Sequence, residues 1–324
     1  MGIDGEAARF LLAGRQAGVS YRRCATLGRM NYFLGRREMA SLLREYGLDP
    51  GRYPKLFATG YSPVRYAEDF WEMLGAEELV TVDASDFEGA TRVHDLNRPI
   101  PADLKGRFDA VCDIGTLEHV FDFPTAIRNC MEMVRVGGHL LMLCPANNFF
   151  GHGFYQFQPE LFHRVFEPAN GFQLEALFTV ECGPRRRWYS TTDPQVIRAR
   201  VTLVNAWPVF LFARARRVGE IPAALKPPQE SDYVAAWNRQ ATHAQSGGID
   251  RLAQPAFLSL KRWLIERLPR LARLLEAWRI SRWNRDFSFR NRRAFALVRK
   301  RDVAKTGAPG CAPAASTSGQ VRRP

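Results

Sequence analysis

Three side chains in the middle of the chain are of types that can transfer protons. Glu118 and His119 are neighbours in the stretch "DIGTLEHVFDF", and His152 lies between two glycines 33 residues after His119. Histidine titrates near neutral pH, so either ring could act as a general base. We expect His152 to be the leading catalytic base, His119 a second catalytic residue and Glu118 a substrate-binding residue. The alternatives are that His152 caps a turn and that His119 locks its own turn by bonding the backbone.

His152 belongs to the segment "PANNFFGHGFYQFQPELF", residues 145–162, which is longer than a simple connection between two elements requires. The segment is rich in Asn, Gly, His and aromatic residues, which can bind a polar ligand or fill the core. We predict that four of its side chains position an acceptor by hydrogen bonds. These substrate-binding candidates are Asn147, Asn148, Tyr155 and Gln156.

The elements around these residues predict an α/β sheet. β-Branched or apolar runs alternate with helical patterns over residues 55–215, which favours a mostly parallel sheet with helices on both faces. We expect a Rossmann-like, doubly wound sheet of about seven strands whose last strand is antiparallel. The predicted strands include "KLFATG" (Lys55–Gly60), "ELVTVD" (Glu78–Asp83), "ATRVHD" (Ala90–Asp95), "RFDAVCD" (Arg107–Asp113) and "HLLMLCPA" (His139–Ala146).

Three successive predicted strands end in an acid. Asp83, Asp95 and Asp113 would therefore meet at one edge of the sheet, where open α/β sheets bind ligands. Because Asp is also common wherever a strand becomes a turn, each of them could be structural. Together, the three acids indicate a shared cleft.

The stretch "FDAVCDIGTLEHVFDFPTAIRNCMEMVRVGGHLLMLCP" resembles the class I S-adenosylmethionine-dependent methyltransferases. It has that family's run of strand, "LEHV"-type turn, helix, "GG" turn and strand, and the resemblance covers roughly residues 55–215. It implies S-adenosyl-L-methionine as the cofactor. By position in the motif it also implies that Asp83 holds the ribose hydroxyls and that Asp95 and Leu96 lie by the adenine. The turn facing the cofactor and the substrate entrance would comprise Asp113, Ile114, Gly115, Leu117, Glu118 and His119.

The sequence departs from this family after the predicted first strand. The family has a glycine-rich "GxGxG" loop there, whereas "FATGYSPVRYAED" offers one glycine, Gly60, as the cofactor-binding candidate. Either the loop binds in another conformation, as in a variant subfamily with a degenerate loop, or methyl transfer has been lost.

Charge is distributed unevenly along the chain. Of the net charge of +13, residues 251–301 carry 15 Lys and Arg against 3 Asp and Glu, and residues 1–250 are close to neutral. We predict a helical N-terminal segment over residues 1–50, a methyltransferase-like domain over 51–217 and a linker over 218–250. A basic amphipathic helical appendage would follow over 251–301, and a disordered tail over 302–324.

The appendage contains an apolar stripe between arginines. In "FLSLKRWLIERLPRLARLLEAWRISRW", residues 257–283, apolar residues recur every three or four positions. This pattern predicts a helix on an anionic membrane surface, kinked at Pro269. One alternative is a helix that packs on the domain. The other is a contact with nucleic acid, which the near-neutral charge of residues 1–250 disfavours.

The cysteines and the N-terminal residues indicate the cellular compartment, and the motifs together indicate the function. The six scattered cysteines and the absence of a signal-peptide pattern predict a cytoplasmic protein, peripheral on the inner face of the membrane if the appendage binds there. We expect no metal. The favoured function is methyl transfer to a sugar, a lipid-linked glycan or another small polar acceptor. The alternatives are a non-catalytic scaffold and, because of the acidic "DASD" at residues 83–86, a nucleotide-sugar glycosyltransferase.

Overall fold

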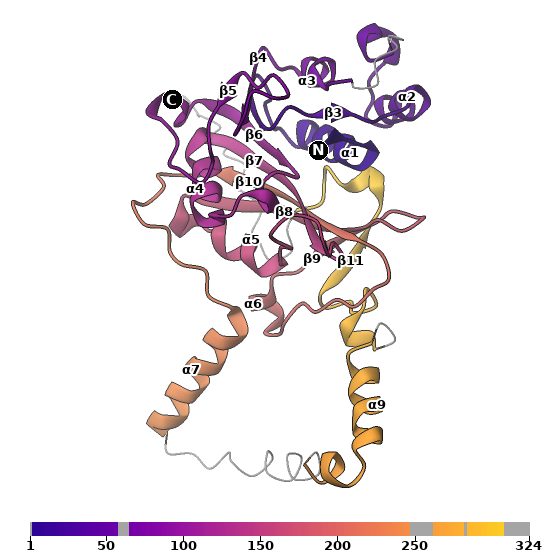
Figure 1. Cartoon of the computed structure of the whole chain (residues 1–324), viewed down its shortest axis with the longest axis vertical. Coiled ribbons are helices and arrows are strands. Elements are labelled where there is room, and N and C mark those ends of the chain that lie inside the picture. The colour runs from indigo at the N-terminus through magenta and orange to yellow at the C-terminus, as the bar shows by residue number, and fades with distance from the viewer. Residues whose placement is uncertain (1, 58–64, 247–261, 282–283, 308–324) are drawn as a thin grey trace, which may run out of the picture.

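A mixed sheet of nine strands forms the centre of the protein in a computed structural model (Figure 1). The structure describes residues 2–57, 65–246, 262–281 and 284–307. In sheet order the strands are β11 (Phe295–Val298), β9 (Arg187–Thr191), β8 (Phe172–Glu181), β10 (Val209–Arg217), β7 (Val134–Asn147), β6 (Phe108–Ile114), β2 (Arg23–Leu27), β4 (Glu78–Asp83) and β5 (Arg92–Val93). Two further short strands, β1 (Gly2–Ile3) and β3 (Asn31–Tyr32), pair with each other in parallel.

Five adjacent strands, β5-β4-β2-β6-β7, are all parallel. Numbered along the chain, these five have the order 3-2-1-4-5, which is the order of the Rossmann-type doubly wound sheet. The direction of winding reverses between β2 and β6, so this is the point where a ligand is expected beyond the carboxyl ends of the strands. The α/β, Rossmann-like fold predicted from the sequence is confirmed.

The predicted position of the first strand was wrong. β2 is that strand, and it lies within the first 50 residues, which we had expected to be helical. Residues Pro54–Phe57 form a 3-10 turn, and Gly60 lies outside the described residues. The sequence "RCATL" is only five residues long and begins with an arginine directly after Arg22, so it lacks a long apolar run, yet its last four residues are buried between neighbouring strands.

The sheet is also wider than the predicted seven strands. The antiparallel strand was correctly expected: β10 pairs antiparallel with both β7 and β8. β9 and β11 extend the sheet beyond β8, each antiparallel to its neighbour. β11 comes from the region predicted as a helical appendage, and its Phe295 is buried in a small apolar cluster with Tyr189. The four apolar residues of β11 therefore pair with β9 and pack Phe295 against Tyr189 instead of continuing the basic helix.

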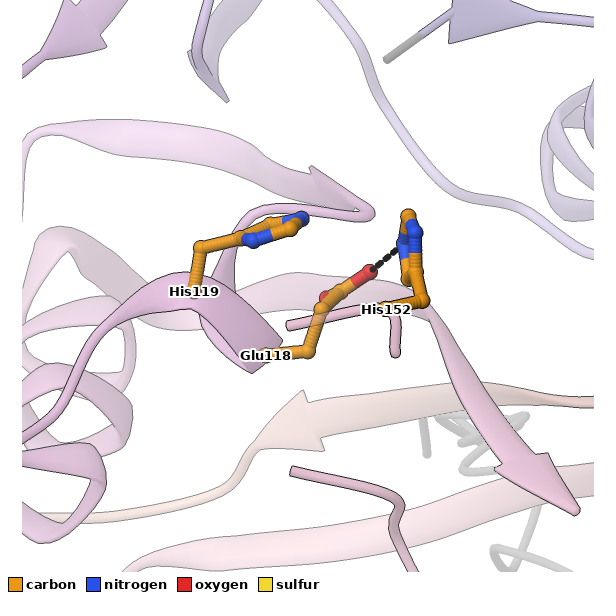
Figure 2. A group of neighbouring side chains, drawn as sticks. All are labelled: Glu118, His119 and His152. Atoms are coloured by element: carbon orange, nitrogen blue, oxygen red, sulfur yellow. Dashed lines mark ion pairs between the residues drawn. The ribbon is translucent and has the colours of Figure 1, made fainter. Parts of the chain in front are cut away.

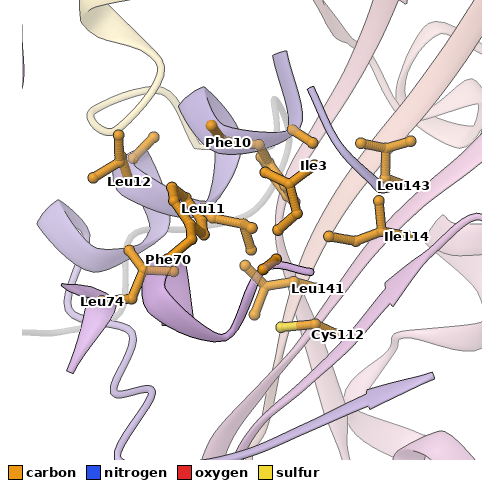
Figure 3. Close-up of a cluster of buried hydrophobic side chains, with 14 of the residues drawn as sticks. Ile3, Phe10, Leu11, Leu12, Phe70, Leu74, Cys112, Ile114, Leu141 and Leu143 are labelled. Carbon is orange, nitrogen blue, oxygen red and sulfur yellow. The ribbon is translucent and has the colours of Figure 1, made fainter. Parts of the chain in front are cut away.

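Helices cover both faces of the sheet. One core contains α1 (Gly5–Gln16), α2 (Arg36–Glu45) and α3 (Glu68–Leu74), and Figure 3 shows residues of α1 against side chains of β6 and β7. The other core contains α4 (Phe123–Met133) and α5 (Pro159–Val165). α1 begins where the Asp4 carboxylate accepts hydrogen bonds from the amides of Glu6 and Ala7, which is a typical N-cap.

The remaining helices lie away from the two cores. α6 (Pro194–Ile197) is a single turn, and α7 (Ser231–Ser246) and α9 (Pro269–Arg279) extend from the same end of the molecule (Figure 1). None of the helices in the described parts of the chain has the length and apolar character needed to cross a membrane.

Candidate active site

The turn after β6 presents Glu118, and Asp113 holds that turn in place. The Asp113 Oδ1 atom accepts hydrogen bonds from the amides of Thr116 at 2.9 Å and Leu117 at 3.4 Å. Thr116 in turn donates from its hydroxyl to the carbonyl of Leu27 at the end of β2. Asp113 is fully buried, and burial together with the nearby Glu118 carboxyl raises its pKa well above the usual range. The hydrogen bonds of Asp113 therefore show a residue that fixes the conformation of the turn.

The Glu118 carboxyl is buried without a hydrogen bond. Its side chain is 1% exposed, and neither oxygen has a hydrogen-bond partner among the described residues. Burial raises the pKa of Glu118 to about 7. Because buried polar groups in proteins are nearly always hydrogen-bonded, such a carboxyl is typical of a functional site.

The loop after β7 places His152 against Glu118. The carbonyl oxygen of Glu118 accepts from the amides of Phe154 at 2.6 Å and Tyr155 at 3.3 Å, which fixes the loop on the turn. Gly153 allows this approach, since it has a φ of +66° and a Cβ there would lie 2.7 Å from that same carbonyl oxygen. As a result, His152 Nε2 lies 3.4 Å from Glu118 Oε1 (Figure 2).

His119 completes a cluster of three. Its ring lies 5.0 Å from that of His152, edge to face, and one potential ligand atom from each of Glu118, His119 and His152 lies within 4.8 Å of the others. Burial, and secondarily the His152 ring, lowers the pKa of His119. Both histidines face solvent, while the carboxyl between them is buried. The structure thus brings together both catalytic candidates and the adjacent glutamate, although their chemical roles remain predictions.

The four predicted acceptor-binding residues hold their own loops. The side-chain amides of Asn147 and Asn148 both donate to the side-chain oxygen of Asn205, at 2.9 and 3.0 Å. The hydroxyl of Tyr155 donates to the carbonyl of Phe121 at 2.5 Å, and the Gln156 side-chain oxygen accepts from the amide of Phe149 at 3.0 Å. These contacts give each residue a structural task, and acceptor binding by them remains a prediction.

The acid after β4 lies at the carboxyl edge, beside the end of β2. Asp83 is the last residue of β4 and is half-buried, and the amide of Gly28 donates to the carbonyl of the adjacent Val82. Ion pairs or side-chain hydrogen bonds of Asp83 are absent among the described residues, so its carboxylate can accept bonds from a ligand.

The other implied cofactor residues have structural partners. Asp95 Oδ1 accepts from the backbone and side-chain nitrogens of Asn97, which lowers the pKa of Asp95. Leu96 is buried, and its carbonyl accepts from Asn129. Of the residues in the turn after β6, Ile114 packs into the core beside α1, Leu117 is buried in the opposite core, and Gly115 has a φ of +87°.

Sequence reasoning missed Arg29, which follows Gly28 in the true first-strand loop. Its guanidinium pairs with Glu68 at 2.7 Å, donates to the carbonyl of Glu88 at 3.0 Å and lies 3.7 Å from the centre of the Tyr66 ring. Arg29 therefore ties the loop after β2 to the loop after β4. Recognition of "CATLG" as a strand followed by a turn would have identified it.

Two cavities lie beside the segment that follows β7. A cavity of about 300 Å³ is lined by residues that include Gln158, Glu160 and Arg200. Arg200 is paired with Asp232 at 2.6 Å and with Glu230 at 3.3 Å. A smaller cavity of about 60 Å³ reaches Asn147 and Leu203. Neither was predicted, because its walls come from segments far apart in the sequence.

Comparison with known proteins gives remote structural similarities. The chain is similar to a 1,6-didemethyltoxoflavin-N1-methyltransferase from Burkholderia thailandensis, solved with S-adenosylhomocysteine, at 14% identity over 65% of this chain and 79% of that one (TM-score 0.35). A branched-chain polyamine synthase from Thermus thermophilus matches at 12% identity over 69% of this chain and 59% of that one (TM-score 0.35). A methyltransferase from Thermotoga maritima matches at 15% identity over 65% and 89% (TM-score 0.29). No protein-family model matches the sequence. No curated protein matches it either.

Proposed function

We propose that this chain is an S-adenosylmethionine-dependent methyltransferase. The observation that carries the proposal is the position of two groups at the switch point of the 3-2-1-4-5 sheet. Asp83 lies at the end of β4 on one side of β2, and the Glu118–His119–His152 cluster follows β6 on the other side. A cofactor and an acceptor that bind at these two places would meet across the end of β2.

The residues at this edge fit the cofactor. A half-buried carboxylate without ion pairs among the described residues, such as that of Asp83, can accept hydrogen bonds from a ribose diol. When bound, S-adenosylmethionine supplies an electrophilic methyl group. The chain's own residues must then hold the acceptor in line and remove its proton.

The Glu118–His119–His152 cluster is the group that we assign to acceptor activation. It combines a buried carboxyl with two histidines that face solvent, so an acceptor hydroxyl can reach it from outside. An acceptor with exposed hydroxyl groups, such as a sugar, a lipid-linked glycan or another small polar molecule, suits this arrangement.

Calorimetry with S-adenosylmethionine tests the cofactor assignment. We expect the unmodified protein to bind the cofactor and the Asp83→Ala variant to bind at least ~10-fold more weakly, because the loss of a hydrogen bond from a charged group costs about 1.5–3 kcal/mol. Asp86→Ala, three residues away and exposed, is the matched control and should bind as the unmodified protein does. A protein that binds no cofactor at all contradicts the proposal.

A second candidate, a non-catalytic scaffold, is favoured by Arg29. Its guanidinium bridges the loops after β2 and β4, where a methyltransferase would admit its cofactor. The same calorimetry distinguishes the two functions, since a scaffold would bind no cofactor and would be insensitive to Asp83→Ala. No observation favours the glycosyltransferase alternative, for which the acidic residues 83–86 would bind a metal ion. Among the described residues, Asp83 and Asp86 do not belong to a group of three side chains that could hold one.

We also propose that α9 binds an anionic membrane surface. None of its residues is buried, so its apolar stripe does not pack on the domain within the described structure. Leu271, Leu274, Leu275 and Trp278 are exposed, and the same helix carries Arg270, Arg273 and Arg279. An apolar stripe bordered by arginines is typical of a helix that lies in the headgroup region. This location would give the enzyme access to a lipid-linked acceptor.

A further inference from the structure

We propose that Glu118, His119 and His152 form a binding site for a divalent transition-metal ion, with Zn²⁺ as the best match. Two imidazoles and one carboxylate are a common ligand set for catalytic zinc, in which the fourth position stays open. The sequence did not indicate the site, because its ligands come from two segments separated by α4 and β7.

The buried carboxyl is the first observation that points to a cation. Glu118 is 1% exposed on its side chain, and its two oxygens lack hydrogen bonds within the described structure. Among the described residues it has no ion pair with a lysine or an arginine, and its one ion pair is with His152. A buried carboxylate is tolerated where it is paired or coordinates a metal. Both oxygens can therefore accept a cation, which no lysine or arginine of the described residues supplies.

The distances are the second observation. Zinc binds nitrogen and carboxylate oxygen at about 2.0–2.2 Å, so two ligand atoms at a tetrahedral centre lie roughly 3.3–3.5 Å apart. The 3.4 Å separation of Glu118 Oε1 and His152 Nε2 matches this spacing. The rings of His119 and His152 flank the Glu118 carboxyl (Figure 2). The ligand atom of His119 is within 4.8 Å of the other two, and a small rotation of this exposed side chain can close the gap.

Hydrogen bonds to the backbone hold the two segments that carry the three ligands. Asp113 holds the turn from which Glu118 and His119 project, and the two amide bonds to the Glu118 carbonyl fix the loop of His152. The ligands are thus fixed by backbone contacts that do not involve the ion. Because the two histidines face solvent, the open position would be accessible to water or to an acceptor.

The role of the ion rests on the proposed function. An acceptor hydroxyl bound at the open position would lose its proton more readily, because the ion stabilises the resulting oxygen anion. The three side chains would then be ligands, and the proton would pass to solvent. Binding of the ion itself does not depend on methyl transfer.

Titration of the chelator-treated full-length protein with Co²⁺ tests the site. Bound Co²⁺ absorbs visible light according to its geometry, and Zn²⁺ should displace it at one ion per chain. We expect Glu118→Gln and His152→Ala each to weaken Co²⁺ binding ~100-fold or more, because losing a ligand costs at least as much affinity as losing a residue that orients one. His94→Ala changes a histidine on the far side of β4 that bonds the carbonyl of Arg98, and should bind as the unmodified protein does.

Two results would overturn the proposal. One is that the unmodified protein binds no Co²⁺ at equimolar concentration, and the other is that both ligand variants bind it with unchanged affinity. His152 is exposed enough that its variant should fold even if Glu118→Gln does not. Calorimetry of the metal-free protein with S-adenosylmethionine separates the two proposals. If the protein binds the cofactor but not Co²⁺, only the metal site is rejected. If it binds Co²⁺ but not the cofactor, only methyl transfer is rejected.

Discussion

Glu118 Oε1 lies 3.4 Å from His152 Nε2, and the two residues differ sharply in exposure: the carboxyl side chain is 1% exposed and the imidazole 49%. The contact joins two segments that the chain brings together only through the folded sheet. It joins a buried acidic group to a ring that solvent, a proton or an ion can reach.

We predict that Glu118→Gln does not destabilise the metal-free protein and raises its melting temperature slightly. The substitution keeps the shape and removes a buried charge that has no hydrogen bond among the described residues. Zn²⁺ at 100 times its dissociation constant should stabilise the unmodified protein by about 2.7 kcal/mol and leave the variant unchanged. Thermal unfolding with and without Zn²⁺ measures both effects, and equal shifts in the two proteins would contradict the prediction.

We predict that Gly153→Ala separates His152 from Glu118. A Cβ at this position would lie 2.7 Å from the Glu118 carbonyl, and the backbone has a positive φ. Gly151→Ala is the matched control, because its φ is also positive, at +86°, but a Cβ there meets no atom within 4 Å. Both variants should lose about 1 kcal/mol from backbone strain. Only Gly153→Ala should also weaken Co²⁺ binding, as measured by absorption.

We predict that His163 makes the protein less stable in mild acid. Burial is the main cause that lowers its pKa to about 4, the Asp193 carboxylate 3.7 Å away acts in the opposite direction, and Arg164 adds to the lowering. The unfolded chain therefore binds a proton near pH 6.5 that the folded protein takes up only near pH 4, so stability falls as the pH drops through this window. Between pH 7.5 and pH 5 the loss should be about 1–2 kcal/mol.

Urea unfolding of the unmodified protein and of His163→Gln at the two pH values isolates this contribution. Other groups titrate in the same range, so the informative quantity is the difference between the two proteins. A variant that loses as much stability as the unmodified protein between pH 7.5 and pH 5 would show that His163 is not the cause.

We predict that Phe295→Ala destabilises the main domain by about 3–5 kcal/mol, because it leaves a cavity at a buried aromatic position. Leu297→Ala, two residues further along β11, is the control: Leu297 is exposed, and its removal should cost less than about 1 kcal/mol. Denaturant unfolding compares the two variants. Equal and small effects would mean that β11 does not contribute to the stability of the sheet.

We predict that Leu274→Glu in α9 reduces binding to anionic vesicles at least ~10-fold, because it places a charge in the apolar stripe. Trp237→Glu in α7 is the control, since that exposed aromatic lies on a helix without lysine and with a single arginine. Flotation with vesicles of phosphatidylglycerol, and with uncharged vesicles for comparison, measures the binding. If the protein binds DNA but not vesicles, and Leu274→Glu has no effect on vesicle binding, the nucleic-acid alternative is favoured instead.

The sequence by itself determined the elements that local patterns specify. "ELVTVD" is β4 residue for residue, "FDAVCD" forms most of β6, and proline and glycine mark the limits of the α4 region. These segments were readable because a buried parallel strand requires a continuous apolar run and a helix requires its own start signals. The choice of Glu118, His119 and His152 came from their residue types and from their positions after two predicted strands.

Only the tertiary structure decided what lies next to what. β2 is short and begins with Arg23 directly after Arg22, so its place in the middle of the five parallel strands appears only when β4 and β6 pair with it on both sides. β11 became a strand because the exposed edge of β9 and a buried ring were available to it. The contact between Glu118 and His152 depends on two backbone bonds and one glycine in a loop 35 residues away from the turn. Such long-range pairings follow from packing and hydrogen bonding, which no local pattern records.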